Sequence, residues 1–138
     1  MSYALSAALQ AAVYARLSGD AALDGLVAGA IYDALPPGPL PPLYVMLGPE
    51  KVRDRSDQTG RGAVHDFTVS VVSESAGFAA AKTAAAAAND ALLGPALTMG
   101  RGHLVSLAFL DAKAARAKSG SLRQIDMTFR ARVEDDAL

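Results

Sequence analysis

The sequence predicts an α+β domain in which two main helices pack on one face of a mostly antiparallel sheet of about four main strands. Three observations lead to this prediction: apolar residues at helical spacing near the N-terminus, a central alanine-rich segment, and apolar–polar alternation on both sides of that segment. The order helix, strand hairpin, helix, strand hairpin lets the second helix cross between strands of one sheet in the favoured right-handed sense. We expect a single domain over residues 1–138.

Residues 3–17 are predicted to form an amphipathic helix that ends at Gly19. Its apolar positions recur every four residues, at Leu5, Leu9, Val13 and Leu17. Asp20 can cap a second, short helical turn, and residues 31–32 then have the character of a short extended segment.

Residues 36–42 contain five of the seven prolines and cannot form a helix or a central strand. We interpret them as a stiff connector; the alternative is a polyproline ligand for a signalling module. Residues 43–47 are predicted to form a strand that can continue past Pro49 to Val52, where the proline indicates an edge or a bulge. Residues 64–73 form the next predicted strand, so the two strands make a hairpin.

A long polar loop is predicted between these strands, over residues 50–62. It is too long and too charged for a simple hairpin turn, so we expect it to be mobile in the free protein. Its mixed charges favour contacts with neighbouring proteins over nucleic acid, while the simpler interpretation is a solvated loop. The candidate assembly-contact residues are Glu50, Lys51, Arg53, Asp54, Arg55, Asp57 and Arg61.

The second half of the chain begins with a predicted helix over residues 76–93, capped by Ser75 and ended by Gly94. Its alanine face allows close approach of the domain's own sheet or of another subunit. Strands are predicted at residues 103–110 and 122–133, joined by a link over residues 111–121. The last strand alternates most clearly, so one face is buried and the other is wet or in an interface. Residues expected under the helices are Phe67, Val69, Val71, Ile125, Met127 and Phe129.

Composition excludes several classes of function. The formal net charge of -1 does not suit a polybasic nucleic-acid binder, and the absence of cysteine excludes disulfides and thiolate chemistry. We find no membrane span, no secretory signal, and no motif for catalysis, a cofactor or a metal. His65 and His103 are interpreted as polar residues at strand starts, and adjacent His65 and Asp66 must point to opposite faces.

Several dispersed segments together resemble a family of small tail-completion proteins, the tail terminators of long-tailed phages, prophages and gene transfer agents. The resemblance spans about residues 8–133 and is strongest toward the version in alphaproteobacterial gene transfer agents. The matching segments are residues 9–23 (Leu-Gln-Ala-Ala-Val-Tyr-Ala-Arg-Leu-Ser-Gly-Asp-Ala-Ala-Leu), Ile31-Tyr32-Asp33, Leu43-Tyr44-Val45, His65-Asp66-Phe67-Thr68-Val69, Asp90-Ala91-Leu92, Leu104-Val105-Ser106-Leu107 and Phe129-Arg130-Ala131.

This resemblance implies a structural virion protein that is not an enzyme. It implies a hexameric ring that caps the tail tube, stops tube polymerisation and docks to the head-side connector, with DNA passing through the lumen without sequence-specific binding. The implied partners are further copies of the chain, the major tail tube protein and the connector, first in the bacterial cytoplasm and then at the head-proximal end of the tail. Alternatives are a head-side neck or connector protein and a small ligand-binding domain.

Overall fold

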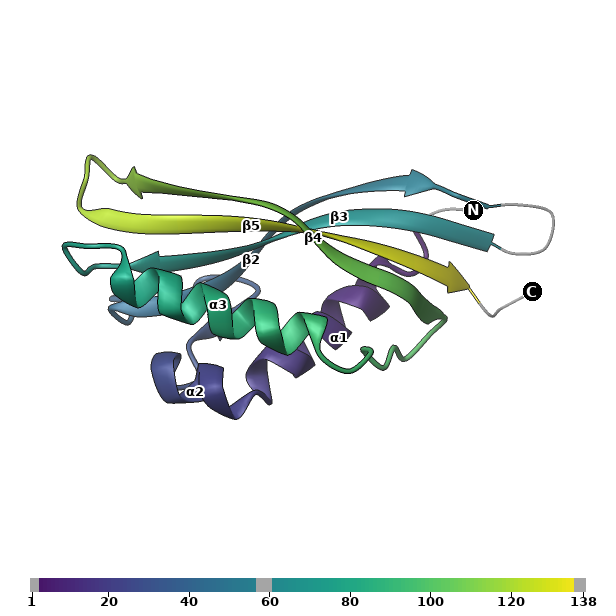
Figure 1. Ribbon diagram of the computed structural model, residues 1–138, viewed down its shortest axis with the longest axis horizontal. Helices are drawn as coiled ribbons and strands as arrows, with labels where there is room; N and C mark the ends of the chain where they lie inside the picture. The colour runs from purple at the N-terminus through teal and green to yellow at the C-terminus, as the bar shows by residue number, and fades with distance from the viewer. Residues whose placement is uncertain (1–2, 57–60, 136–138) are drawn as a thin grey trace.

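A computed structural model describes residues 3–56 and 61–135, which fold as a five-stranded sheet with three helices on one face (Figure 1). The predicted α+β class is confirmed. The four long strands are joined by a two-residue strand at residues 31–32, and a short helix accompanies the two main helices. We call the covered side of the sheet the helix face and the other side the open face.

The helices begin and end close to the predicted positions. Helix α1 is Ser6–Ser18 and helix α2 is Ala21–Val27, where the Asp20 side chain accepts a hydrogen bond of 2.9 Å from the Leu23 amide. Helix α3 is Ala79–Leu93. The predicted Ser75 cap is wrong, because Phe78 occupies the N-cap position and makes no side-chain cap.

The sheet has the strand order β1-β2-β3-β5-β4. The strands are β1 (Ile31–Tyr32), β2 (Leu43–Asp54), β3 (Arg61–Ser73), β4 (His103–Ala117) and β5 (Leu122–Asp135). Strand β1 runs parallel to β2, and the other neighbours are antiparallel. Since β3 and β4 both oppose β5, they are parallel to each other, and α3 is the crossover between them.

The predicted loop over residues 50–62 is wrong for most of its length. Glu50 pairs with Phe67 and Asp54 with Ala63, so β2 continues to Asp54 and β3 already begins at Arg61. Cross-strand pairing satisfies the backbone donors and acceptors whatever side chains the strands carry, so a charged composition did not prevent a ladder here. Residues 57–60, part of the segment expected to be mobile, lie outside the described residues.

The predicted link over residues 111–121 is also mostly strand. Strand β4 continues to Ala117 and β5 begins at Leu122, with Lys118, Ser119 and Gly120 turning the chain at positive φ. Alanine, lysine and arginine have low strand propensity, yet pairing with β5 decides their conformation.

The core lies between the helices and the helix face of the sheet. All six residues expected there are buried, with exposed fractions of 8% or less. Phe129 is fully buried and stacks on Phe67 with ring centroids 5.6 Å apart. The alanine face of α3 packs against the chain's own core. Its buried members are Ala81, Ala84, Ala85, Ala88 and Ala91. Small side chains allow this close packing.

Candidate functional site

Charged residues of three strands gather on the open face. The register places Lys51, Asp66 and Arg130 in one cross-strand row, and Arg53 and Arg132 on either side of Val64 in the next. Arg130 donates from Nε to Asp66 Oδ1 at 2.8 Å and from Nη2 to Oδ2 at 3.0 Å. Arg53 Nη2 lies 3.8 Å from Asp66 Oδ2. We call the five charged residues the open-face cluster: Lys51, Arg53, Asp66, Arg130 and Arg132.

The open-face cluster is basic overall. Hydrogen bonds from Arg130 lower the pKa of Asp66, and the same contact raises the pKa of Arg130, so both groups stay charged near neutral pH. One carboxylate then faces four cations. Arg132 is exposed, and Arg130 is exposed although two of its nitrogens bond to Asp66, so the cluster can meet an anionic or carboxylate-bearing partner.

A β-bulge determines which residues of β2 reach the open face. The register shifts between Leu47 and Glu50, where two intervening residues of β2 oppose one of β3. This extra residue reverses the alternation, so that Glu50 turns to the helix face while Lys51 and Arg53 turn to the open face. The expectation that Pro49 marks an edge or a bulge is confirmed.

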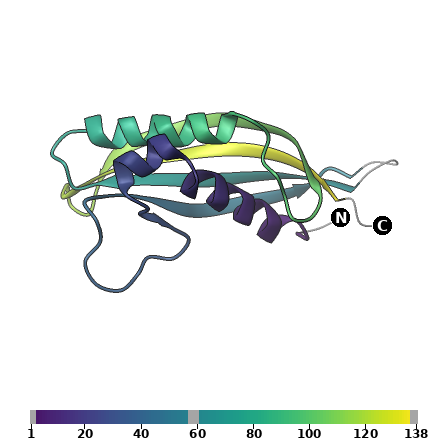
Figure 2. The same ribbon diagram turned by 90° about the horizontal axis from the view of Figure 1, so that it is seen from below.

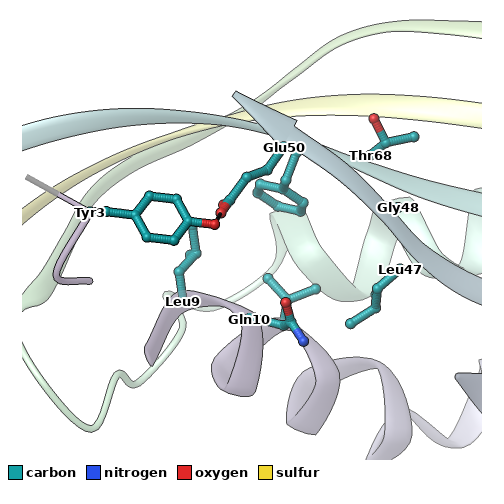
Figure 3. A pocket seen from close by; sticks show the side chains of 9 residues that line it. Tyr3, Leu9, Gln10, Leu47, Gly48, Glu50 and Thr68 are labelled. Atoms are coloured by element: carbon teal, nitrogen blue, oxygen red, sulfur yellow. Dashed lines mark hydrogen bonds between the residues drawn. The ribbon is translucent and has the colours of Figure 1, made fainter. Parts of the chain in front are cut away.

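Glu50, one of the predicted contact residues, is directed into the fold (Figure 3). Its Oε1 accepts hydrogen bonds from the Tyr3 and Ser6 hydroxyls, and its Oε2 lies 3.2 Å from His65 Nδ1. Burial by itself raises the pKa of Glu50, but the bonds from Ser6, Tyr3 and His65 outweigh it, and the pKa is lowered. Glu50 therefore ties the start of α1 to the sheet.

His65 is the residue that sequence reasoning placed least well. It lies inside β3 rather than at its start, and its side chain is completely buried. The alternation of residues 64–73 puts its side chain on the face of Phe67 and Val69, but nothing in the sequence indicates the Glu50 carboxylate opposite it. Asp66 points to the open face, as expected for its neighbour in a strand. His103 begins β4 as predicted and is exposed, 3.5 Å from Glu134 Oε1.

The remaining predicted contact residues lie at the end of the β2–β3 hairpin. The Arg55 amide donates to the Gly62 carbonyl at 2.8 Å, and the Ser56 hydroxyl donates to Asp54 at 2.8 Å. Asp54, Arg55 and Arg61 are exposed. Asp57 lies outside the described residues. The structure thus divides the predicted residues among the open face, the hairpin end and the core.

A small cavity of about 210 Å³ lies between α1 and β2 (Figure 3). Its lining residues are Tyr3, Leu9, Gln10, Val13, Leu47, Gly48, Glu50, Phe67 and Thr68. The strongest polar groups on its wall, the Tyr3 hydroxyl and the Glu50 carboxylate, already bond to each other. Within residues 3–56 and 61–135, no three His, Cys, Asp or Glu residues are grouped to hold a metal ion. None of the described helices could cross a membrane.

Comparison with known proteins gives one family and a closely similar structure. The sequence matches the family model of tail completion protein gp17 over residues 11–134. It is also similar to a chain in the solved structure of the virion of a native gene transfer agent particle, with 60% sequence identity and a TM-score of 0.91. That similarity covers 96% of this chain and 99% of the other. No curated protein matches the chain.

Proposed function

We propose that this chain, a member of the tail completion protein gp17 family and a structural protein of a virion tail, caps the finished tail tube. In this proposal copies of the chain form a hexameric ring that stops tube polymerisation. The ring also presents the surface to which the head-side connector docks, and DNA passes through its lumen without sequence-specific contacts. The chain would assemble in the bacterial cytoplasm and remain at the head-proximal end of the tail.

The observation that carries this proposal is the similarity, along nearly the whole chain, to a protein that is part of a gene transfer agent virion. The similarity covers 96% of this chain and 99% of the other, at 60% sequence identity, which supports a shared role in the particle. The family is one of structural proteins, which agrees with a site made of charged surface groups rather than a nucleophile and a base.

The open-face cluster and the end of the β2–β3 hairpin are the surfaces that we assign to contacts with the tube or the connector. They carry the predicted contact residues Lys51, Arg53, Asp54, Arg55 and Arg61, and Asp57 belongs to the same segment. Charged, exposed groups set register and partner choice more than affinity, which suits a protein that must accept one partner on each side. Weak contacts repeated around a ring add up to a stable joint.

The proposal is tested by deleting the gene in a producing strain and imaging the particles. We expect tails of uncontrolled length or tails without heads, restored by the intact gene. Labelling the protein in normal particles should place it where tail meets head. A label on the head side of the joint would instead favour a neck or connector protein, and normal particles in the deletion strain would refute the proposal.

The hairpin assignment has its own test. Replacing residues 57–60 with a two-residue Asn-Gly turn keeps both strands in register, because Asp54 pairs with Ala63 and Arg55 bonds to Gly62, so the thermal midpoint should change by only a few degrees. Joining of tails to heads should fail. A variant of unchanged length, in which Arg55 and Arg61 become Gln, separates the effect of charge from that of length. Normal infectious or transducing particles from both variants would show that the hairpin end is only a solvated turn.

A further inference from the structure

Large exposed apolar side chains fall into two groups on opposite flanks of the molecule. One group lies on or beside β4 and the end of α3: Leu93, Val105, Phe109 and Leu110. The other lies on or beside α1, α2 and the segment after β1: Tyr3, Tyr14, Leu26 and Leu35. We call these the β4 flank and the β1 flank. They adjoin opposite edges of the sheet, and Figure 2 shows α3 and the loop after β1 on opposite sides.

The β4 flank contains an open apolar groove of about 530 Å³. It is lined by α3 (Lys82, Ala85, Ala86, Asn89, Leu93), β4 (Phe109, Ala112, Ala114) and β5 (Ile125, Met127). Phe109 remains 43% exposed although its ring meets Phe129 edge-on at 5.8 Å. Strand β4 is also an edge strand of 15 residues. Such a long unpaired edge beside exposed apolar side chains is a template for association unless something covers it.

The β1 flank has a hollow of similar size, about 510 Å³. It is lined by Tyr3, Ser6, Ala7, Gln10, Ala11, Tyr14 and Asp33. Strand β1 has only two residues and pairs only with Val45 and Met46, so it shields little of the outer edge of β2. This flank therefore also combines apolar side chains with a poorly covered sheet edge.

The two flanks carry opposite charge. The β4 flank has Lys82, Lys113, Arg116 and Lys118 against Asp90 and Asp111. The β1 flank has Asp20, Asp24 and Asp33. Within α1, α2 and residues 33–42 the cation is Arg16, which is directed instead to the carbonyls of Ala91, Pro95 and Ala96, at 2.9, 2.7 and 3.2 Å; Lys51 and Arg53 of β2 point to the open face. Surfaces that differ in charge sign attract each other and repel their own copies.

We infer that the β4 flank of one copy of this chain binds the β1 flank of the next, head to tail. Two different, complementary surfaces on opposite edges produce a heterologous contact, which closes into a ring when the rotation between subunits allows it. A two-fold dimer would bring like charges together, so the charge pattern favours the head-to-tail arrangement. This inference rests on the proposed ring and identifies the surfaces that build it.

The natural absence of cysteine makes a cross-linking test direct. Leu110→Cys marks the β4 flank and Leu35→Cys marks the β1 flank; both side chains are exposed. In assembled particles treated with a flexible bismaleimide, the double variant should give a ladder up to the full ring, and each single variant should give only monomer. Dimers from a single variant would indicate like-with-like pairing and would overturn the inference.

Charge reversal gives a second readout. Lys113→Glu with Arg116→Glu should reduce incorporation into particles at least tenfold, and adding Asp24→Lys with Asp33→Lys should restore it. Thermal midpoints of the purified variants show that each remains folded. If the protein is located at the head-proximal end of the tail but shows neither the cross-linked ladder nor rescue by the second pair of charge reversals, the inference fails and the proposed function stands. If the ladder forms but the protein is located elsewhere in the particle, the inference stands and the proposed function fails.

Discussion

Phe129→Ala is the substitution that most directly tests the assigned strand register. Phe129 is fully buried, stacks on Phe67 at 5.6 Å and receives Phe109 edge-on at 5.8 Å. Removing a buried phenyl ring costs about 3–5 kcal/mol, because apolar contacts are lost and a cavity remains. That is a large part of the roughly 5–15 kcal/mol that holds a domain of this kind together. The thermal midpoint should fall by about 10 °C or more.

The measurement is urea unfolding followed by far-ultraviolet circular dichroism, which is suitable because the chain contains no tryptophan. Phe109→Ala is the matched control: the same ring is removed from the same aromatic cluster, but from a side chain that is 43% exposed. We expect it to cost about 1 kcal/mol, since much less area leaves water there. Equal losses for the two variants, or an unchanged midpoint for Phe129→Ala, would refute the register.

Three further predictions concern single contacts. Glu50→Gln should lower stability at neutral pH by about 1.5–3 kcal/mol, the range for hydrogen bonds to a charged group. The pKa of Glu50 is lowered in the folded protein, so the stability difference between the parent protein and Glu50→Gln should be complete above the pKa of Glu50 in the unfolded chain. It should disappear as the pH falls through the pKa in the folded protein. Urea unfolding at a series of pH values measures this. A double-mutant cycle of Asp66→Asn and Arg130→Gln should give a coupling of about 1 kcal/mol or less, since the Arg130 side chain is 44% exposed. Gly102→Ala should destabilise the fold, because φ is +67° and a Cβ atom would lie 2.5 Å from the Glu134 carbonyl oxygen; Gly25→Ala, with open space around it, should leave the thermal midpoint unchanged or raise it.

Some misplaced residues show where reasoning from sequence stops. The charged composition of residues 50–62 predicts a loop, with the strand continuing at most to Val52, but β3 supplies backbone partners as far as Asp54. Residues 111–117 were assigned to a link for their composition, and β5 pairs with them in the same way. In both cases a distant segment decides the conformation, and local propensity carries no information about that segment.

The candidate site depends on the same kind of information. Alternation along β5 puts Arg130 and Arg132 on the same face of the sheet. Their neighbours Asp66 and Arg53 come from other strands, and the bulge beside Pro49 determines that Lys51 faces outward while Glu50 faces inward. A shift of one residue reverses every side chain beyond it, so the membership of the open-face cluster could not be obtained from spacing alone.

By itself the sequence determined the fold class, the order of the main elements and the residues of the central core. Periodic apolar positions in α1, β3 and β5 encode which side of each element is buried, because an apolar face must be covered somewhere. Only the tertiary structure decided where the strands end, that Glu50 and His65 meet in the interior, and that opposite charges lie on opposite flanks. These features depend on contacts between residues far apart in the chain, and periodicity within one segment does not specify its partners.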